Sequence, residues 1–253
     1  MILGIVQARA SSSRLPGKVL KKILDKPMII LELERIARSR RIEKLVLATS
    51  TEPSDDELAS AVAAAGYEVY RGSLDDVLGR YYECAKKYSA DHIVRLTGDC
   101  PLIDPVVIDA VIARHTLTGA DYSSNTLGEE TFPDGLDCEV MTFAALENAY
   151  NNARLSSERE HVTPYIRNND EFKKTGVSYM GKSLNSERWT VDEERDFSLV
   201  TAVYKALYPE KPDFNMVDVL DFLNKNPEIH ALNRGIIRNE GLAKSIASDH
   251  LVK

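Results

Sequence analysis

The sequence predicts an α/β fold with a mostly parallel central sheet. Three short apolar runs, at residues 2–6, 45–48 and 92–96, have the length and composition of buried strands. Each run stops at polar or glycine-containing residues, and amphipathic stretches of helical period separate the runs. Open α/β sheets bind ligands beyond the carboxyl ends of their strands, so the residues that follow these runs are the first place to look for function.

The composition is that of a globular protein. Of the 253 residues, 43% are hydrophobic and 28% are charged, which suits one large α/β domain or one domain plus an extension. The net charge of −7 argues against a nucleic-acid partner, which requires a basic face. No apolar run is long enough for a membrane helix and the first residues lack a signal-peptide pattern, so a cytoplasmic protein with no membrane partner is expected. The three cysteines are widely spaced and fit reduced thiols.

The remaining elements follow from periodicity and helix-end signals. Pro27 precedes an amphipathic helix, and residues 54–57 form a capping-box sequence for a helix that ends at Gly66. A second capping box is expected at Ser157 and Glu160. Further strands are expected at residues 68–70, 121–123 and 187–191. One further helix is expected to begin at residue 75, one to span residues 105–115, one to end at residue 208, and one to begin at residue 216 and break at residues 226–227.

The loop after the first strand is rich in groups that bind phosphate. Three cations, Arg9, Arg14 and Lys18, stand among three consecutive serines, and a Pro16-Gly17 turn follows. Guanidinium groups match phosphate oxygens bidentately, while lysine, hydroxyls and loop amides supply further donors. The sequence has neither a G-x-G-x-x-G after this strand nor a P-loop motif. The loop is therefore either a phosphate cradle of another kind or a solvated connection.

A carboxylate follows the strand at residues 92–96. Asp99 comes just after Gly98 and is followed by Cys100 and Pro101. At the carboxyl end of a strand and beside a loop that binds phosphate, a carboxylate is the natural anchor for Mg²⁺, which shares its remaining positions with phosphates and water. The alternative is a turn aspartate that binds its own backbone.

A second carboxylate follows the strand expected at residues 187–191, which carries the sole tryptophan. Asp192 stands directly after it, and Asp196 lies four residues further on. Asp192 is either a metal ligand or the N-cap of the next helix, and Asp196 is expected to be structural.

Together these segments resemble the nucleotide-sugar cytidylyltransferases, which include the sialic-acid- and KDO-activating enzymes. Residues 8–18 match the signature A-R-x-x-S-x-R-L-P-x-K, Asp99 falls in G-D-x-P, and Asp192 falls in the V-D segment. The resemblance implies a three-layer α/β/α sandwich with the Rossmann-like fold of nucleotide-diphospho-sugar transferases. It also implies catalytic roles for Lys18, Arg9 and Asp99, and Mg²⁺ ligation by Asp99 and Asp192. The nucleotide-binding residues that it implies are Ala8, Arg9, Ser12, Ser13, Arg14, Lys18, Asp76 and Thr97.

Two further segments resemble the spore-coat-polysaccharide subgroup of these enzymes. They are Gly135-Leu136-Asp137-x-Glu139 and residues 159–164, so Glu139, Arg159 and His161 are expected to contact the acceptor. The alternative role for Asp75 and Asp76 is to stabilise the N-terminus of the helix that begins there, because negative charge is favoured at that end of a helix. The resemblance implies residues 1–210 as the catalytic domain, with an acceptor-binding or dimerisation insertion around 125–185. It implies residues 211–253 as a helical extension, and a homodimer.

The expected activity is Mg²⁺-dependent transfer of CMP from CTP to a sugar with release of pyrophosphate, in surface polysaccharide biosynthesis. The resemblance implies CTP and a sugar, with an acidic sugar of the nonulosonate type as acceptor. Three alternatives stay open: a different nucleoside triphosphate, a metal-dependent glycosyltransferase, and a nucleotide-binding homologue without catalysis. The glycosyltransferase normally shows D-x-D, which stands on no matching strand of this sequence.

Overall fold

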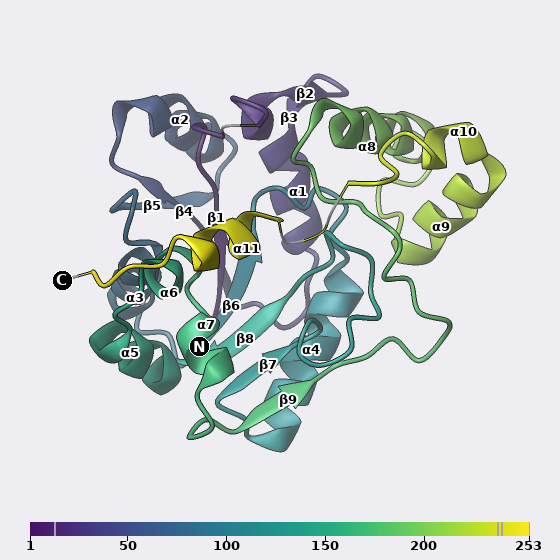
Figure 1. Ribbon diagram of the computed structural model, residues 1–253. Helices are drawn as coiled ribbons and strands as arrows, with labels where there is room; N and C mark the ends of the chain where they lie inside the picture. The colour runs from purple at the N-terminus through teal and green to yellow at the C-terminus, as the bar shows by residue number, and fades with distance from the viewer. Residues whose placement is uncertain (13, 237, 239, 253) are drawn as a thin grey trace.

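The central sheet positions every loop singled out above. A computed structural model describes residues 1–12, 14–236, 238 and 240–252. In this part of the chain the main sheet has seven strands in the order β5-β4-β1-β6-β8-β7-β9 (Figure 1). β1, β4, β5 and β6 are mutually parallel, β8 is antiparallel to β6 and β7, and β9 is parallel to β7. The strands are β1 (Ile2–Gln7), β4 (Lys44–Ser50), β5 (Glu68–Gly72), β6 (His92–Thr97), β7 (Tyr122–Ser124), β8 (Glu139–Thr142) and β9 (Lys174–Gly176).

Helices fill the connections between these strands, and β2 (Lys22–Ile23) and β3 (Lys26–Pro27) form a small separate hairpin. Short 3₁₀ turns stand at η1 (Lys18–Leu20) and η2 (Pro53–Asp55). The α-helices are α1 (Met28–Ile36), α2 (Asp56–Ala64), α3 (Val77–Lys87), α4 (Pro105–Thr118), α5 (Phe143–Asn152), α6 (Ser156–His161), α7 (Pro164–Asn168), α8 (Glu194–Leu207), α9 (Met216–Lys225), α10 (Pro227–His230) and α11 (Glu240–Ala247).

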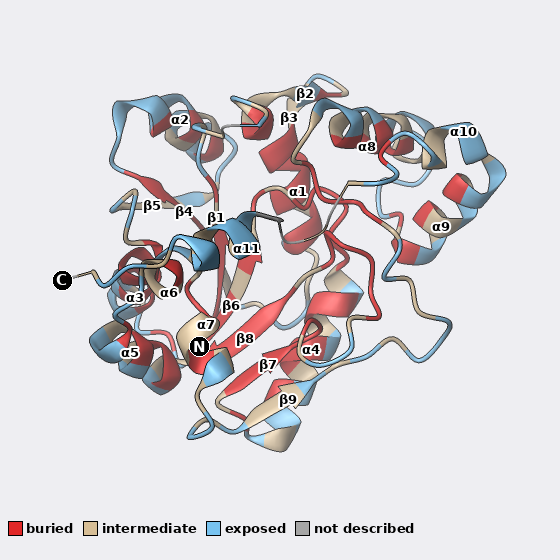
Figure 2. Ribbon diagram, viewed as in Figure 1, coloured by how far each residue is buried: buried red, intermediate tan, exposed pale blue. Residues whose placement is uncertain are grey.

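The core is divided by the sheet into two hydrophobic clusters. Successive strand residues point to opposite faces, so Val6 and Leu96 join one cluster while Ile5 and Ile93 join the other. Buried side chains of α1, α2, α4, α8 and α9 pack in the first cluster, and those of α3, α5 and α7 pack in the second. Figure 2 shows the strands buried between helices whose outer faces are exposed. The predicted three-layer sandwich with a mostly parallel sheet is confirmed.

Residues 187–191 are not a strand, contrary to the prediction. In this segment the only bridge among the described residues is an isolated one, between Asp134 and Arg188. Its amides bond to loops instead, because Trp189 N donates to Asp134 O at 2.6 Å and Val191 N to Asp99 O at 2.8 Å. The segment therefore joins two loops at the edge of the sheet.

Both predicted capping boxes are wrong, because their side chains bind elsewhere. Asp55 accepts from Ser50 and from the Ala10 amide, and α2 has no side-chain cap. Ser157 lies inside α6 and donates to Asp249 at 2.6 Å, while Glu158 accepts from the Leu155 amide at 3.0 Å. In each case a tertiary hydrogen bond replaces the local one.

The C-terminal residues return to the sheet. α9 packs into the first cluster through Met216, Val219 and Leu223, and α11 then lies against α6 (Figure 1). The last residues run beside the segment before α6, where Ser156 N donates to the carbonyl of His250 at 2.9 Å. The boundary at residue 210 stays a prediction. Among the described residues, no helix combines the length and apolar character needed to cross a membrane.

Candidate active site

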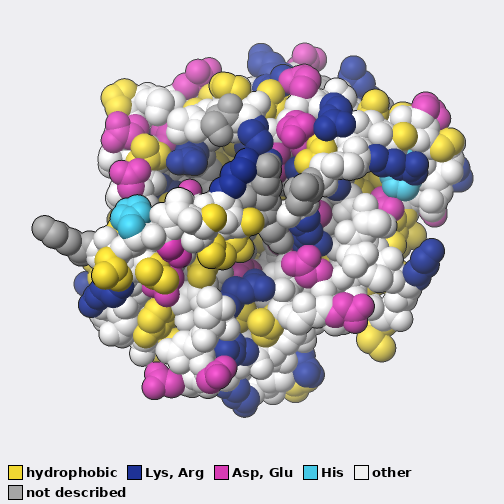
Figure 3. Space-filling model, in the orientation of Figure 1, with side chains coloured by type: hydrophobic (Ala, Val, Ile, Leu, Met, Phe, Trp, Pro, Cys, Tyr) yellow, Lys and Arg dark blue, Asp and Glu magenta, His cyan; other side chains and the backbone are white. Residues whose placement is uncertain are grey.

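A cleft of about 1030 Å³ opens at the carboxyl edge of the parallel strands. It is formed by the loop after β1, the loop after β6 and residues 188–192, and its far wall comes from β8, α6 and α11. Figure 3 shows basic and acidic side chains close together around the hollow of this face. Gln7 and Thr97 are register partners at the ends of β1 and β6, so the loops that follow them must meet.

The loop after β1 is closed on itself and fastened to the neighbouring strand. Gly17 N donates to Ala10 O at 3.0 Å, and Gly17 has a φ of +68°, which favours glycine. Ala10 N donates to Asp55 Oδ1 at 2.7 Å. Burial alone would raise the pKa of the Asp55 carboxyl, but hydrogen bonds from Ser50 and Ala10 outweigh it and lower this pKa. Asp55 therefore holds the loop as a buried carboxylate, a role that the sequence did not indicate.

Lys18 joins the three loops. Its side chain is buried, and Nζ lies 3.2 Å from Asp99 Oδ2, 3.0 Å from Asp192 Oδ1 and 2.7 Å from Val191 O. Burial opposes the charged form, yet the two carboxylates outweigh burial and raise the lysine pKa. The convergence of Lys18, Asp99 and Asp192 agrees with the sequence interpretation.

Gly98 lets the loop after β6 pack directly against the loop after β1. A Cβ at Gly98 would lie 2.7 Å from Ala8 Cβ and 2.9 Å from Ile29 Cδ1, closer than side-chain atoms approach. Asp99 follows immediately, with its carboxylate half-buried. Burial alone would raise the pKa of Asp99, but the charge of Lys18 outweighs it and keeps this pKa below its usual value.

Arg188 holds the third loop, although the sequence analysis did not select it. Its guanidinium reaches Asp196 Oδ1 at 3.0 Å, Asp134 Oδ2 at 2.7 Å and Asp192 Oδ2 at 2.9 Å. Asp196 is buried and accepts from the Asp192 and Glu193 amides, so its expected structural role is consistent with these contacts. Glu193 is the N-cap of α8, which leaves the Asp192 side chain facing the cleft. Arg188 thereby orients the second carboxylate.

The other predicted phosphate ligands stand around this centre. Ala8, Arg9 and Ser12 line the cleft, and Arg14 Nη2 lies 2.9 Å from Asp192 Oδ1. Thr97 also lines it, with Oγ1 3.4 Å from Cys100 Sγ. Ser13 lies outside the described residues.

Asp76 makes contacts that fit the alternative role given to it. Its Oδ1 accepts from Gly79 N at 2.9 Å and caps α3, while its other oxygen pairs with Arg159. From the same segment, Asp75 and Arg80 line the cleft. Nucleotide binding by Asp76 stays a prediction.

The three predicted acceptor residues line the far end of the cleft. Glu139 is buried and its oxygens accept from Arg95, from Tyr122 and, at 2.8 Å, from Thr163 Oγ1. Arg159 lies over the ring of Tyr150, 5.0 Å from its centroid, and His161 Nε2 lies 3.0 Å from Ser245 Oγ. Their role as acceptor contacts stays a prediction.

Comparison with known proteins decides the family. A family model described as Cytidylyltransferase matches residues 3–225. The chain belongs to the cytidylyltransferase family. It is 32% identical over 238 residues to the spore coat polysaccharide biosynthesis protein SpsF of Bacillus subtilis, covering 90% of this chain and 95% of that protein. It is 37% identical over 237 residues to an uncharacterized protein of Methanocaldococcus jannaschii, covering 93% and 95%.

A solved structure agrees with both the family and the fold. The chain resembles the structure of a cytidylyltransferase from Leptospira borgpetersenii serovar Hardjo-bovis with a TM-score of 0.87 and 32% identity. That match covers 94% of this chain and 99% of the other. The resemblance to the cytidylyltransferases and to their spore-coat subgroup is confirmed, and the chain is a cytidylyltransferase enzyme.

The carboxylates of this cytidylyltransferase suit a hard divalent cation. Asp99 Oδ2 and Asp192 Oδ1 each lie within 3.2 Å of the same atom, Lys18 Nζ, so the two carboxylates point to one place. Within the described ranges, no group of three or more histidine, cysteine or acidic side chains forms a complete metal cage. Mg²⁺ characteristically takes one or two protein carboxylates and completes its shell with phosphate and water oxygens. The donor set therefore fits Mg²⁺ delivered with a triphosphate.

Proposed function

We propose that this cytidylyltransferase transfers CMP from CTP to a hydroxyl group of an acidic sugar, in a Mg²⁺-dependent reaction of surface polysaccharide biosynthesis. Lys18 carries this proposal, because it brings the phosphate loop and two carboxylates from distant loops to one point. A triphosphate requires a positive charge beside its phosphates, and its divalent cation requires carboxylates. Lys18 and the two acids provide both at the carboxyl edge of the sheet.

The side chains have distinct roles in binding CTP. Arg9, Arg14 and Lys18 hold the β- and γ-phosphates, and the amides of the closed loop add further donors. Asp99 and Asp192 would hold Mg²⁺, which supplies positive charge at the phosphates when it is bound. Lys18 and Arg14 form ion pairs with these carboxylates. Their positive charges therefore lie beside the place where the phosphate oxygens would bind.

The reaction is a single in-line displacement. A sugar hydroxyl oxygen forms a bond to the α-phosphorus, the bond from that phosphorus to the bridging oxygen breaks, and pyrophosphate leaves. The hydroxyl proton passes to solvent. No covalent enzyme intermediate is needed, because positioning and neutralisation of charge carry nucleotidyl transfer. Lys18 and the arginines neutralise the charge that develops on the leaving pyrophosphate.

An acidic acceptor fits the far end of the cleft. Arg159, Arg167 and Lys244 line this part, so a carboxylate on the sugar would meet cationic groups there. The name of the Bacillus subtilis relative places that protein in spore coat polysaccharide biosynthesis, which supports a surface polysaccharide as the destination of the product.

The proposal also includes a cytoplasmic homodimer, as the family resemblance implies. Cys84, Cys100 and Cys138 are buried and free, as suits a reducing compartment.

Thermal unfolding with CTP, UTP, GTP and ATP in turn, with and without Mg²⁺, tests the nucleotide. A ligand at a hundred times its dissociation constant adds about 2.7 kcal/mol to the free energy of unfolding, so a true substrate is readily detected. A shift with CTP that grows with Mg²⁺ supports the proposal, and a shift with another nucleotide alone contradicts it.

Pyrophosphate release from CTP with a panel of acidic sugars then tests the reaction. Binding of CTP without release from any sugar acid would favour a non-catalytic homologue. Turnover of a nucleoside diphosphate-sugar in place of CTP would favour a glycosyltransferase.

A further inference from the structure

Glu32 is a carboxyl group on the apolar face of α1. It is 0% exposed and lies among the buried side chains of Ile29, Leu31, Leu33 and Ile36. Glutamate is almost never fully buried unless it is paired, since removing its polar atoms from water is costly. None of the motifs of the sequence analysis includes it, and the proposed reaction does not use it.

The described residues provide Glu32 with one hydrogen bond. Its Oε2 accepts from the backbone N of Cys100 at 3.2 Å, while Oε1 is buried without a hydrogen-bond partner among the described residues. Burial, and next the negative charge of Asp99, raise the pKa of the Glu32 carboxyl well above its usual value. The one hydrogen bond of this buried carboxyl group among the described residues is therefore the bond from the Cys100 amide.

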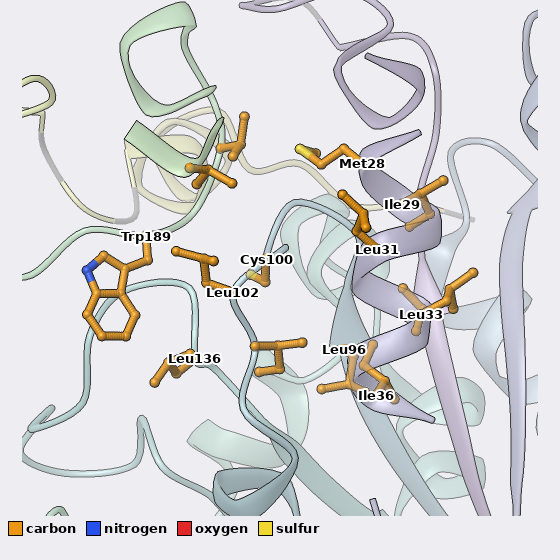
Figure 4. Close-up of a cluster of buried hydrophobic side chains, with 14 of the residues drawn as sticks. Met28, Ile29, Leu31, Leu33, Ile36, Leu96, Cys100, Leu102, Leu136 and Trp189 are labelled. Carbon is orange, nitrogen blue, oxygen red and sulfur yellow. The ribbon is translucent and has the colours of Figure 1, made fainter. Parts of the chain in front are cut away.

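That amide belongs to the residue directly after Asp99. On its other side the loop is held by the Asp99 carbonyl, which accepts from Val191 N at 2.8 Å and from Thr190 Oγ1 at 3.1 Å. Gly98 fixes the loop against Ala8. Figure 4 shows Cys100 between Leu102 and the labelled side chains of α1. The hydrogen bond to Cys100 N shows that Glu32 reaches the loop from this helix. With these contacts the backbone on both sides of the Asp99 side chain is held.

We propose that Glu32 is a positioning residue, which fixes the Asp99 carboxylate for Lys18 and for the divalent cation through its hydrogen bond to the Cys100 amide. The metal part of this inference rests on the proposed function. Partners that orient metal ligands have large effects, since their loss typically lowers metal affinity or activity by about 10- to 100-fold.

Two substitutions separate positioning from simple packing. Glu32→Gln keeps an acceptor oxygen for the Cys100 amide and the shape of the side chain, so it should bind Mn²⁺ in the presence of CTP as the unchanged protein does. Glu32→Met keeps the volume but removes the acceptor, so its Mn²⁺ affinity should fall by about tenfold. Leu33→Met, at the next position of the same buried helix, controls for repacking and should leave Mn²⁺ affinity unchanged.

The melting temperature of the ligand-free variants gives a second readout. Glu32→Met leaves one amide without its acceptor, which lowers Tm, but it also removes an unpaired polar atom from the core, which raises Tm. Because the two effects oppose each other, Tm should fall by no more than about 6 °C. A residue needed only for folding would instead lower Tm together with metal affinity. Titration calorimetry with Mn²⁺ at saturating CTP measures the affinity, and unfolding monitored by circular dichroism measures Tm.

Three outcomes would overturn the proposal. They are an unchanged Mn²⁺ affinity in Glu32→Met, an equal loss in Glu32→Gln and Glu32→Met, or a fall of Tm in Glu32→Met by more than about 6 °C. Failure of the proposed function is seen separately, because the unchanged protein would then fail to release pyrophosphate from CTP with every acceptor. The variants would still report on the loop through Mn²⁺ binding with CTP.

Discussion

Lys18 Nζ lies 3.0 Å from Asp192 Oδ1, a contact between residues 174 positions apart in the sequence. The same nitrogen lies 3.2 Å from Asp99 Oδ2, so three loops depend on one buried ammonium group. Two carboxylates that converge on a cation repel each other when the cation is removed. The arrangement makes Lys18 the group that keeps the acidic pair together, and in the proposed function the same ammonium group also binds phosphate.

Loss of Lys18 or of the Asp99 charge should abolish most of the activity. A charge-assisted hydrogen bond contributes about 1.5 to 3 kcal/mol, so Lys18→Ala should lower pyrophosphate release from CTP by at least about tenfold. Asp99→Asn should do the same while the circular dichroism spectrum stays that of the folded protein. Lys21→Ala is the control, because Lys21 pairs with Glu194 on the surface. Near-normal turnover in either site variant would refute the site assignment.

Asp55 should control the shape of the phosphate loop without touching CTP. Asp55→Ala leaves the Ala10 amide and Ser50 without their acceptor, which costs about 1 to 3 kcal/mol for each buried group left unpaired. We expect a lower Tm and weaker CTP binding, measured by calorimetry. The neighbouring Asp56 is exposed and pairs with Arg71, so Asp56→Ala should change neither quantity appreciably. Unaltered CTP affinity in Asp55→Ala would show that the loop holds its shape without this bond.

Arg188 should be required for stability as well as for the site. Its guanidinium pairs with Asp134, Asp192 and Asp196, and Asp196 is fully buried. Arg188→Met removes the guanidinium that pairs with the buried Asp196, and breaking a buried pair from one side typically costs about 3 to 5 kcal/mol. Urea unfolding should show a loss of this size. Arg195→Met, which removes an exposed partner of Glu193, should change the free energy of unfolding by less than about 1 kcal/mol.

The sequence allowed the three loops of the site to be predicted because parallel strands end at one edge of a sheet. The first two follow the predicted strands β1 and β6, whose last residues, Gln7 and Thr97, are register partners. The third loop was placed on a strand that does not form, yet Asp192 still reaches the site. The backbone amides of residues 189 and 191 donate to the neighbouring loops, and these hydrogen bonds hold the third loop at the edge of the sheet.

The residues that support the site could not be predicted in the same way. Asp55 has the local sequence of a helix cap, and only the fold shows that its acceptors bind Ala10 and Ser50. Arg188 has acids four and eight residues later, but its contact with Asp134 depends on tertiary structure. The roles of both side chains depend on partners that are distant in the sequence, and the spacing of residues does not predict such contacts.

His115 is a neutral histidine in the core beneath the sheet. It is 1% exposed, its Nε2 lies 3.0 Å from His92 Nδ1, and its Nδ1 lies 2.9 Å from Ser123 Oγ. Burial, and next the nearby His92, lower its pKa to about 4, while Asp121 acts in the opposite direction. In the unfolded chain this pKa is about 6.5, so between about pH 6.5 and 4 the unfolded state binds a proton that the native state does not.

The stability contributed by His115 is therefore complete above about pH 6.5 and is lost as the pH falls towards 4, by up to about 3 kcal/mol. Urea unfolding of the unchanged protein and of His115→Gln at pH 7, 6 and 5 measures this contribution as the difference in unfolding free energy between the two proteins. We expect the difference in unfolding free energy between the two proteins to shrink as the pH falls. His250→Gln, at an exposed position, is the matched control for a histidine substitution. If the difference for His115→Gln is constant or grows on acidification, His115 is not held neutral by burial.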